Sequence, residues 1–188
     1  MTAEVIREML LASAELKQTM ADTLAEDIDR VADLIRASLK NGGKVLLMGN
    51  GGSAADAQHI AAELIGRYKR ERRALPALAL SVDTSALTAI GNDYGYEFVF
   101  SRQIEGLARK GDVVIGISTS GNSDNVIRGL EAAEKAGAAT VALLGKGGGK
   151  ARDRAQISLV VPSNDTARIQ EAHITLGHII CELLDSEG

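Results

Sequence analysis

The sequence predicts an α/β fold in which helices flank a doubly wound, five-stranded parallel sheet. Short apolar runs rich in β-branched residues alternate with segments of helical periodicity, which is typical of parallel sheets. Two of the expected strands end in loops rich in glycine and serine, as strands beside a ligand crevice do. The 188 residues, 45% hydrophobic and 24% charged, suit one domain over residues 1–188 with an ordinary soluble composition.

The N-terminal segment, residues 1–40, is predicted to be helical. From about residue 2 to residue 40, apolar side chains recur at helical spacing without glycine or proline between them. The pattern predicts one long helix, or two that meet near Ala21 and Asp22, ended by the Asn-Gly-Gly sequence at 41–43. The apolar stripe is long for a helix that only covers a small sheet. Self-association is therefore the preferred interpretation, with core packing as the alternative.

The first expected strand, residues 44–48, leads into Gly-Asn-Gly-Gly-Ser-Ala at 49–54, which opens a helix through Tyr68. Taken literally, this loop has the glycine spacing of a dinucleotide-binding fingerprint. The next strand, 77–82, is followed by Asp83, where an acid that binds ribose could lie. Two features argue against a dinucleotide. Asp83 comes about thirty residues after the loop rather than the usual twenty or so, and a second, serine-rich loop would have no role.

That second loop follows a buried strand at residues 112–117. Hydroxyl side chains occupy positions 118–120, a Gly-Asn turn follows, and Asn122 or Ser123 is expected to cap a helix that runs through Ala136. Hydroxyls and backbone N–H groups at the positive end of a helix dipole form an anion site, most naturally for phosphate. The alternative is a plain serine-rich turn with a helix cap.

Two further strands are expected at residues 139–144 and 157–161. In the order 2-1-3-4-5 the crevice of the sheet opens between the first and third strands. Those strands carry the two Gly/Ser loops, which therefore converge on one pocket and favour the phosphate interpretation. The glycine-rich segment 145–150 is not a Walker loop, because its glycine spacing is wrong and Ala151 stands where Ser or Thr should.

Polar side chains on two helices could bring chemistry to this pocket. His59 and Glu63 are four residues apart and share a helix face; the alternative is a surface pair in which Glu63 binds Arg67. On the last expected helix, residues 167–184, Gln170 and His178 interrupt an almost wholly apolar surface, and buried polar groups need partners.

A rise of about 12 Å separates Gln170 from His178 along that helix. Either they reach one point from opposite directions, or a neighbouring subunit supplies one of them. His173 and Glu171 lie at other angles and are assigned no role. The basic cluster at residues 69–73 is interpreted as a solvated helix end.

Composition excludes several function classes. A net charge of -4, a pI near 5.4 and only two Phe and three Tyr argue against nucleic acid as the main partner. The single cysteine, Cys181, lies among apolar neighbours and is interpreted as a core residue in a reducing cytosol. No apolar run approaches membrane-spanning length, so we expect neither a signal peptide nor an anchor, and a cytoplasmic location.

Four stretches of the sequence resemble the SIS (sugar isomerase) fold, and specifically the bacterial phosphoheptose isomerases: GNGGSAADAQHIAAEL, GNDYG, GDVVIGISTSGNSDNVI and TARIQEAHITLGHIICEL. The resemblance covers nearly the whole chain from about Asn41. It implies a homotetramer that converts sedoheptulose 7-phosphate to D-glycero-D-manno-heptose 7-phosphate. That reaction is the first step toward the heptose of lipopolysaccharide core or other surface glycans.

The resemblance also implies residue roles. Glu63 and His178 would carry the proton transfers, and one zinc ion per subunit, with no nucleotide cofactor, would bind to His59, Glu63, Gln170 and His178. Ala54, Ala55 and Ala167 stand where relatives can carry polar residues. The residues implied to contact substrate are Asn50, Gly51, Gly52, Ser53, Glu63, Asn92, Asp93, Ser118, Thr119, Ser120, Ser123 and Gln170.

The chemistry of an aldose–ketose isomerase agrees with these residues. It needs a base to move a proton between C1 and C2, an acid to serve the two oxygens, and stabilisation of an enediolate. Glu63 suits the first role and His178 the second, although Glu63 cannot be a tight metal ligand and a free base in the same instant. Two other classes remain: a non-catalytic SIS adaptor, such as a regulator of replication initiation, and a dinucleotide-dependent oxidoreductase. Retention of Glu63 and His178 favours the enzyme.

Overall fold

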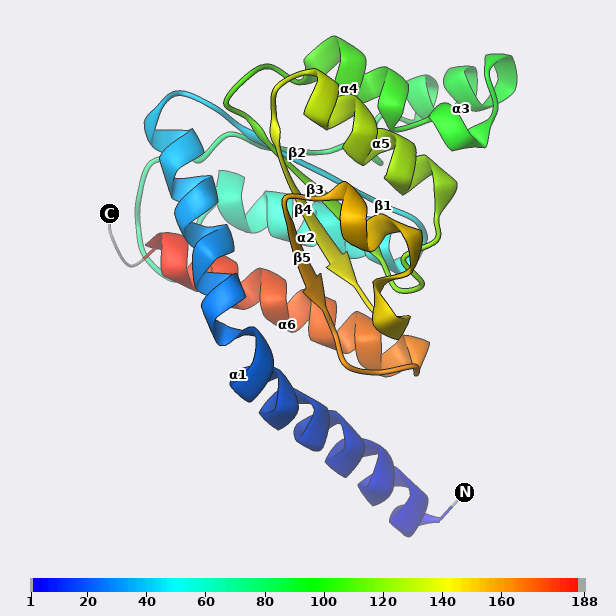
Figure 1. Cartoon of the computed structure of the whole chain (residues 1–188). Coiled ribbons are helices and arrows are strands. Elements are labelled where there is room, and N and C mark those ends of the chain that lie inside the picture. Colours follow the sequence, from blue (N-terminus) through cyan, green and yellow to red (C-terminus); the bar gives the residue numbers. More distant parts are fainter. Residues whose placement is uncertain (1, 186–188) are drawn as a thin grey trace.

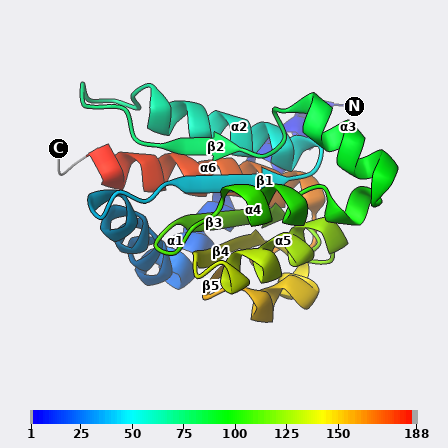
Figure 2. The same ribbon diagram turned by 90° about the horizontal axis from the view of Figure 1, so that it is seen from above.

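A parallel sheet of five strands forms the centre of this computed structural model, which describes residues 2–185. Figure 2 shows the strands side by side in the order β2-β1-β3-β4-β5, which confirms the predicted order. Every residue of β1 and β3 is buried, because helices cover both faces of the sheet. The strands are β1 (Val45–Gly49), β2 (Ala77–Ala79), β3 (Val113–Ser118), β4 (Ala139–Leu144) and β5 (Ile157–Val160).

The helices form two layers, one on each face of the sheet (Figure 1). Side chains of β1 alternate between the two cores, so that Val45 and Leu47 face one layer while Leu46 and Met48 face the other. The first layer contains α1 (Ala3–Lys40), α2 (Gly52–Ile65) and α6 (Thr166–Asp185). The second contains α3 (Thr84–Asp93), η1 (Tyr96–Phe98), α4 (Ser101–Leu107), α5 (Asp124–Lys135) and η2 (Lys146–Arg154).

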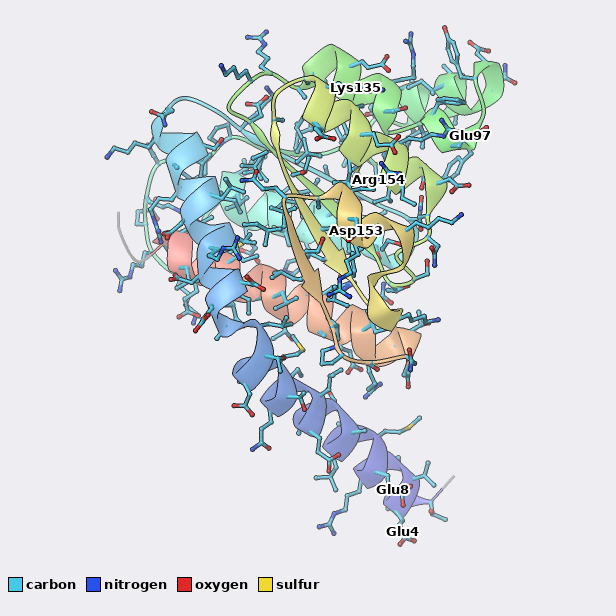
Figure 3. All side chains as sticks on the ribbon, viewed as in Figure 1. Glu4, Glu8, Glu97, Lys135, Asp153 and Arg154 are labelled. Atoms are coloured by element: carbon cyan, nitrogen blue, oxygen red, sulfur yellow. The ribbon has the colours of Figure 1, made fainter. Side chains whose placement is uncertain are left out.

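Helix α1 is one continuous helix whose second half packs in the core, while its first half contacts the body through Leu16 and through bonds of Ser13 and the Met9 carbonyl to α6. Its buried residues run from Met20 to Leu39, whereas Leu10 near the start is 67% exposed. The first half projects away from the sheet, with Glu4 and Glu8 at its far end (Figure 3). The apolar stripe therefore serves core packing in one half and stays largely uncovered in the other.

The basic cluster at residues 69–73 is not simply a solvated helix end. Helix α2 already ends at Ile65, and the Arg72 side chain is only 8% exposed because its Nε donates to Asp185 at 2.6 Å. Burial by itself would raise the pKa of Asp185, but hydrogen bonds from the backbone N–H groups of Lys69 and Arg70 and from Arg72 lower it. The prediction was wrong for Arg72, because its partner lies more than a hundred residues away, at the C-terminal end of α6.

Two smaller expectations also have an outcome. The second strand is shorter than the predicted 77–82, since β2 ends at Ala79 and Val82 is half exposed. Cys181 is fully buried, which confirms it as a core residue, and burial raises the pKa of its thiol to about 12. No helix in the described range 2–185 is long and apolar enough to cross a membrane.

Candidate active site

Two loops leave the sheet side by side at the carboxyl ends of β1 and β3. These strands are neighbours in parallel register, with Gly49 paired to Ile117, so the loop after Gly49 and the loop after Ser118 begin at the same edge. This edge is the point where the strand order reverses, which is the ligand crevice of doubly wound sheets. The predicted convergence of the two loops is confirmed.

Backbone conformation at this edge requires glycine. Gly121 has a φ of 65°, and a Cβ added there would lie 1.9 Å from the carbonyl oxygen of Gly148. The backbone N–H of Ala151 also donates to the Gly121 carbonyl at 2.9 Å. The glycine-rich segment after β4 therefore packs against the serine-rich loop and hydrogen-bonds to it.

The serine-rich loop presents hydroxyls at the start of α5. The Ser118 and Ser123 hydroxyls lie 3.0 Å apart, and the Gly121 N–H donates to the Ser118 oxygen. Asn122 donates its N–H to the Ser120 oxygen at 3.1 Å. Ser123 occupies the N-cap position as expected, but in the described chain its side chain accepts no capping bond and turns toward Ser118. Hydroxyls at a helix N-terminus suit a phosphate group.

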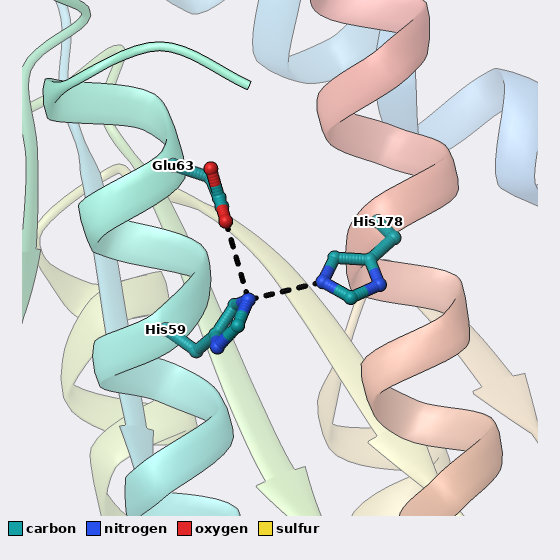
Figure 4. A group of neighbouring side chains, drawn as sticks. All are labelled: His59, Glu63 and His178. Carbon is teal, nitrogen blue, oxygen red and sulfur yellow. Dashed lines mark hydrogen bonds and ion pairs between the residues drawn. The ribbon is translucent and has the colours of Figure 1, made fainter. Parts of the chain in front are cut away.

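A separate cluster lies where α2 meets α6 (Figure 4). His59 Nε2 is 3.2 Å from Glu63 Oε1 and 3.0 Å from His178 Nε2. The ring of Tyr68 stacks on His178 with centroids 5.5 Å apart. Glu63 therefore pairs with His59 and not with Arg67, which lies near Glu71, so that part of the alternative is wrong, whereas His59 is indeed exposed.

The donor atoms of this cluster fit a divalent metal ion. One nitrogen from each histidine and one carboxylate oxygen lie within 4.8 Å of one another, and both Nε2 atoms point to the same place. Two imidazoles and a carboxylate are a familiar set for a catalytic ion that keeps an open position. The structure therefore contains a possible metal-binding triad of His59, Glu63 and His178.

Gln170 lies at the other end of the α2–α6 contact. A Cβ added to Gly52 would stand 1.6 Å from Gln170 Nε2, so the amide lies against the first residue of α2. His178 lies two turns further along α6, beside His59. Gln170 therefore lies next to the first loop and away from His178, as the spacing along α6 predicted. Its roles toward substrate and metal stay predictions.

Thr119 lies half-buried in the serine-rich loop, and the other remaining predicted contacts lie at the start of α2 or at the end of α3. Ser53 is buried, while Gly51 and Gly52 are exposed at the start of α2. Asn92 and Asp93 are exposed at the end of α3, where the Asn92 amide donates to Asp93. The first loop also contacts Asn125 and Tyr96, which sequence analysis missed. A polar residue on the inward face of α5 was the available signal for Asn125.

Two titratable groups on the same helices, partly buried Asp56 on α2 and buried His173 on α6, have shifted pKa values. Burial raises the pKa of Asp56 to about 6, and the nearby His59 opposes this shift. Burial lowers the pKa of His173 to about 4, although a hydrogen bond with the Leu144 carbonyl, 3.1 Å from Nε2, acts the other way. His173 is therefore neutral, and its Nε2–H donates to β4, which agrees with the absence of a predicted catalytic role.

Comparison with known proteins identifies the class. The family model described as SIS domain matches residues 10–145, and the chain belongs to this family. Within it, the chain belongs to the phosphoheptose isomerases. It is 58% identical to the phosphoheptose isomerase of Aquifex aeolicus over 182 residues, which cover 97% of this chain and 95% of that protein.

Solved structures agree with this assignment. The phosphoheptose isomerase of Neisseria gonorrhoeae superposes with a TM-score of 0.92 at 48% identity, over 97% of this chain and 98% of that one. That of Francisella tularensis gives 0.95 at 36% identity, with both chains covered completely. The predicted fold and family are confirmed.

Proposed function

We propose that the chain is an aldose–ketose isomerase that converts sedoheptulose 7-phosphate to D-glycero-D-manno-heptose 7-phosphate in heptose biosynthesis. The family supports the isomerase, since relatives of 53–60% identity are named phosphoheptose isomerase. The observation that carries the proposal is the cluster of Glu63, His59 and His178, which supplies a carboxylate and imidazoles from α6 and from α2, the helix that begins at the first Gly/Ser loop.

The phosphate group and the reacting carbons need separate sites, because C7 carries the phosphate and C1 and C2 react. Hydroxyls of Ser118, Ser120 and Ser123 at the start of α5 suit the phosphate. Glu63 then removes a proton from C1 and returns it to C2, while His178 moves the hydroxyl proton from O1 to O2. Proton removal at C1 gives an enediolate, whose charge N–H donors and cations stabilise.

His59, Glu63 and His178, with Gln170, would hold a divalent ion, which we propose to be zinc. When bound, the ion supplies a positive charge that polarises the carbonyl oxygen. Glu63 can accept the proton from C1 only when its carboxylate is not fully engaged as a metal ligand. His178 is oriented by the stacked ring of Tyr68.

We also propose that the protein is a cytoplasmic homotetramer. Support comes from the uncovered apolar residues of the first half of α1 and from a hollow of about 400 Å³ between α1 and α6, lined by Met20, Ile28 and Ile179 among others. Exposed apolar surface of this extent is typical of an assembly interface.

Incubation of the purified protein with sedoheptulose 7-phosphate tests the reaction. We expect the ketose to convert to the aldose until equilibrium, followed by NMR, and unphosphorylated sedoheptulose to react far more slowly. Binding of the phosphate sugar without conversion or solvent proton exchange would favour the non-catalytic adaptor. Binding of NAD would favour the oxidoreductase instead.

A further inference from the structure

The side chains of Asn50 and Asn125 form a reciprocal amide pair between the first loop and the start of α5. Asn50 Nδ2 donates to Asn125 Oδ1, and Asn125 Nδ2 donates to Asn50 Oδ1, both at 2.8 Å. Asn50 directly follows β1, and Asn125 is the second residue of α5. The pair therefore joins the two loops that converge at the carboxyl edge of the sheet, although 75 positions separate these residues in the sequence.

Because Asn125 is buried, loss of either hydrogen bond of the pair would be costly in free energy. Asn125 is 4% exposed, and a buried amide that loses its partner costs more than an exposed one. One N–H of Asn50 is used by Asn125, and the second remains for another acceptor. An Asn50 side chain locked in this way presents that N–H in one orientation.

A third group completes the arrangement. The Tyr96 hydroxyl donates to Asn50 Oδ1 at 3.2 Å, so this oxygen accepts two hydrogen bonds. Tyr96 belongs to η1, and within the described chain neither α3 nor η1 contains a buried residue. The bond to Asn50 therefore ties the segment that carries Asn92 and Asp93 to the first loop.

We propose that Asn125 is a positioning residue for substrate. We propose that Tyr96 assists it by a second hydrogen bond to Asn50. Asn125 holds Asn50, and with it the first loop, at a set distance and orientation from the serine-rich loop. Tyr96 holds the α3–η1 segment against the same point. The inference rests on the proposed function, because the ligand positioned is its sugar phosphate. Loss of positioning should weaken substrate binding more than it slows proton transfer, because the proton-transfer groups themselves are unchanged.

Asn125→Asp gives the sharpest test. Its carboxylate still accepts from Asn50 Nδ2 but has no proton to donate to Asn50 Oδ1, so we expect KM for sedoheptulose 7-phosphate to rise roughly tenfold with a smaller change in kcat. Protonation restores the donor, so the KM defect relative to wild type should shrink as pH falls toward 5. Asn125→Ala should show a defect without this pH dependence. Asn41→Asp, at the exposed end of α1, is the matched control.

Tyr96→Phe provides a second variant that should fold, because the Tyr96 side chain is largely exposed. It removes only the hydroxyl, and we expect KM to rise by about threefold at unchanged melting temperature. A wild-type KM for both Asn125→Asp and Tyr96→Phe at every pH, with the Asn125 variant only less stable, would show that the pair is merely structural.

Wild-type turnover is measured first, so that a failure of the proposed isomerase function can be told apart from a failure of the positioning role of Asn125. If the wild type does not isomerise the sugar, the proposed function falls. Calorimetric titration with sedoheptulose 7-phosphate then tests the positioning role in the same variants. Weaker binding by Asn125→Asp than by Asn41→Asp would support that role, and equal binding would overturn it.

Discussion

Glu63 lies 3.2 Å from His59, which in turn lies 3.0 Å from His178, so the chemistry of each side chain depends on the other two. Helix α2 supplies two of these groups one turn apart, and α6 supplies the third. Arg67, one turn beyond Glu63, points to a different partner. The carboxylate is therefore directed toward the imidazoles and is not neutralised by an arginine.

Glu63→Gln keeps the shape of the side chain and removes the base. We expect the variant to bind substrate and to lose roughly a hundredfold or more in kcat, because general-base catalysis contributes that much. His178→Gln should behave likewise. Exchange of the substrate C1 proton in deuterated solvent measures the step directly. Exchange at the wild-type rate in Glu63→Gln would exclude Glu63 as the base.

His173 should make folding stability depend on pH. Burial lowers its pKa from 6.5 to about 4, so the unfolded chain takes up the proton first and stability is lost as pH falls from 6.5 through 4. The wild type should lose about 3 kcal/mol more than His173→Gln between pH 7 and pH 4. Denaturant unfolding at both pH values measures this. Equal losses for the two proteins would show that His173 is not buried as a neutral group.

At the scale of elements, helices α2 and α5 each begin at one of the two loops, and α6 packs along α2. The N-terminus of α5 is the element proposed to hold phosphate, while the α2–α6 contact carries the proposed acid, base and metal ligands. This division matches a substrate whose charged end and reacting end are different.

Replacement of Ser120 and Ser123 by alanine should weaken phosphate binding selectively. We expect roughly a hundredfold loss of affinity for sedoheptulose 7-phosphate, because hydrogen bonds to a charged group are strong. Unphosphorylated sedoheptulose should be affected little, and it serves as the matched control ligand. Calorimetry provides both affinities. An equal loss for the two sugars would rule out the phosphate assignment.

A metal bound to His59 and His178 would link α2 to α6, so it should stabilise the fold as well as support catalysis. We expect zinc to raise the melting temperature of the chelator-treated wild type, and not that of His59→Ala. Activity should fall on chelation and return with zinc. Full activity after verified metal removal would exclude a catalytic role for the ion but would leave the acid–base assignment standing.

At the scale of the whole molecule, most apolar side chains in the first half of α1 are not covered by the described core. Ile6 and Leu10 are more than half exposed, and the α1–α6 hollow lies near the point where the helix leaves the body. Burial of these side chains against other copies of the chain would remove a costly apolar surface from water.

We expect the protein to be a tetramer by light scattering on a sizing column. Leu10→Glu should shift it toward smaller species, because a charge would be buried in the interface. Glu4→Lys, at the far end of α1, is the control. Lys17→Glu is unsuitable as a control because Lys17 lines the hollow. A monomer at micromolar concentration that is fully active would refute both the assembly and a site shared between subunits.

Much of the fold was predictable because it depends on local patterns. Apolar runs and helical periodicity indicated the five strands and the long helices, and the alternation of the two indicated a parallel sheet, for which the doubly wound order was assumed and is confirmed. The short helices α3 and α4 were missed because 10 and 7 residues span too few turns for an apolar period to stand out. The role of Arg72 was missed because a charge run is usually solvated, whereas here a distant carboxylate, Asp185, lies beside it.

The sequence by itself determined the fold class, the two Gly/Ser loops and the candidate set that includes His59, Glu63 and His178. Only the tertiary structure decided which of these side chains meet. His178 reaches His59 because α6 packs closely on α2, where a Cβ on Gly177 would stand 2.6 Å from Ile60. Periodicity records which face of a helix is apolar, but not which residue lies opposite, since packing of both helices on one sheet sets that distance.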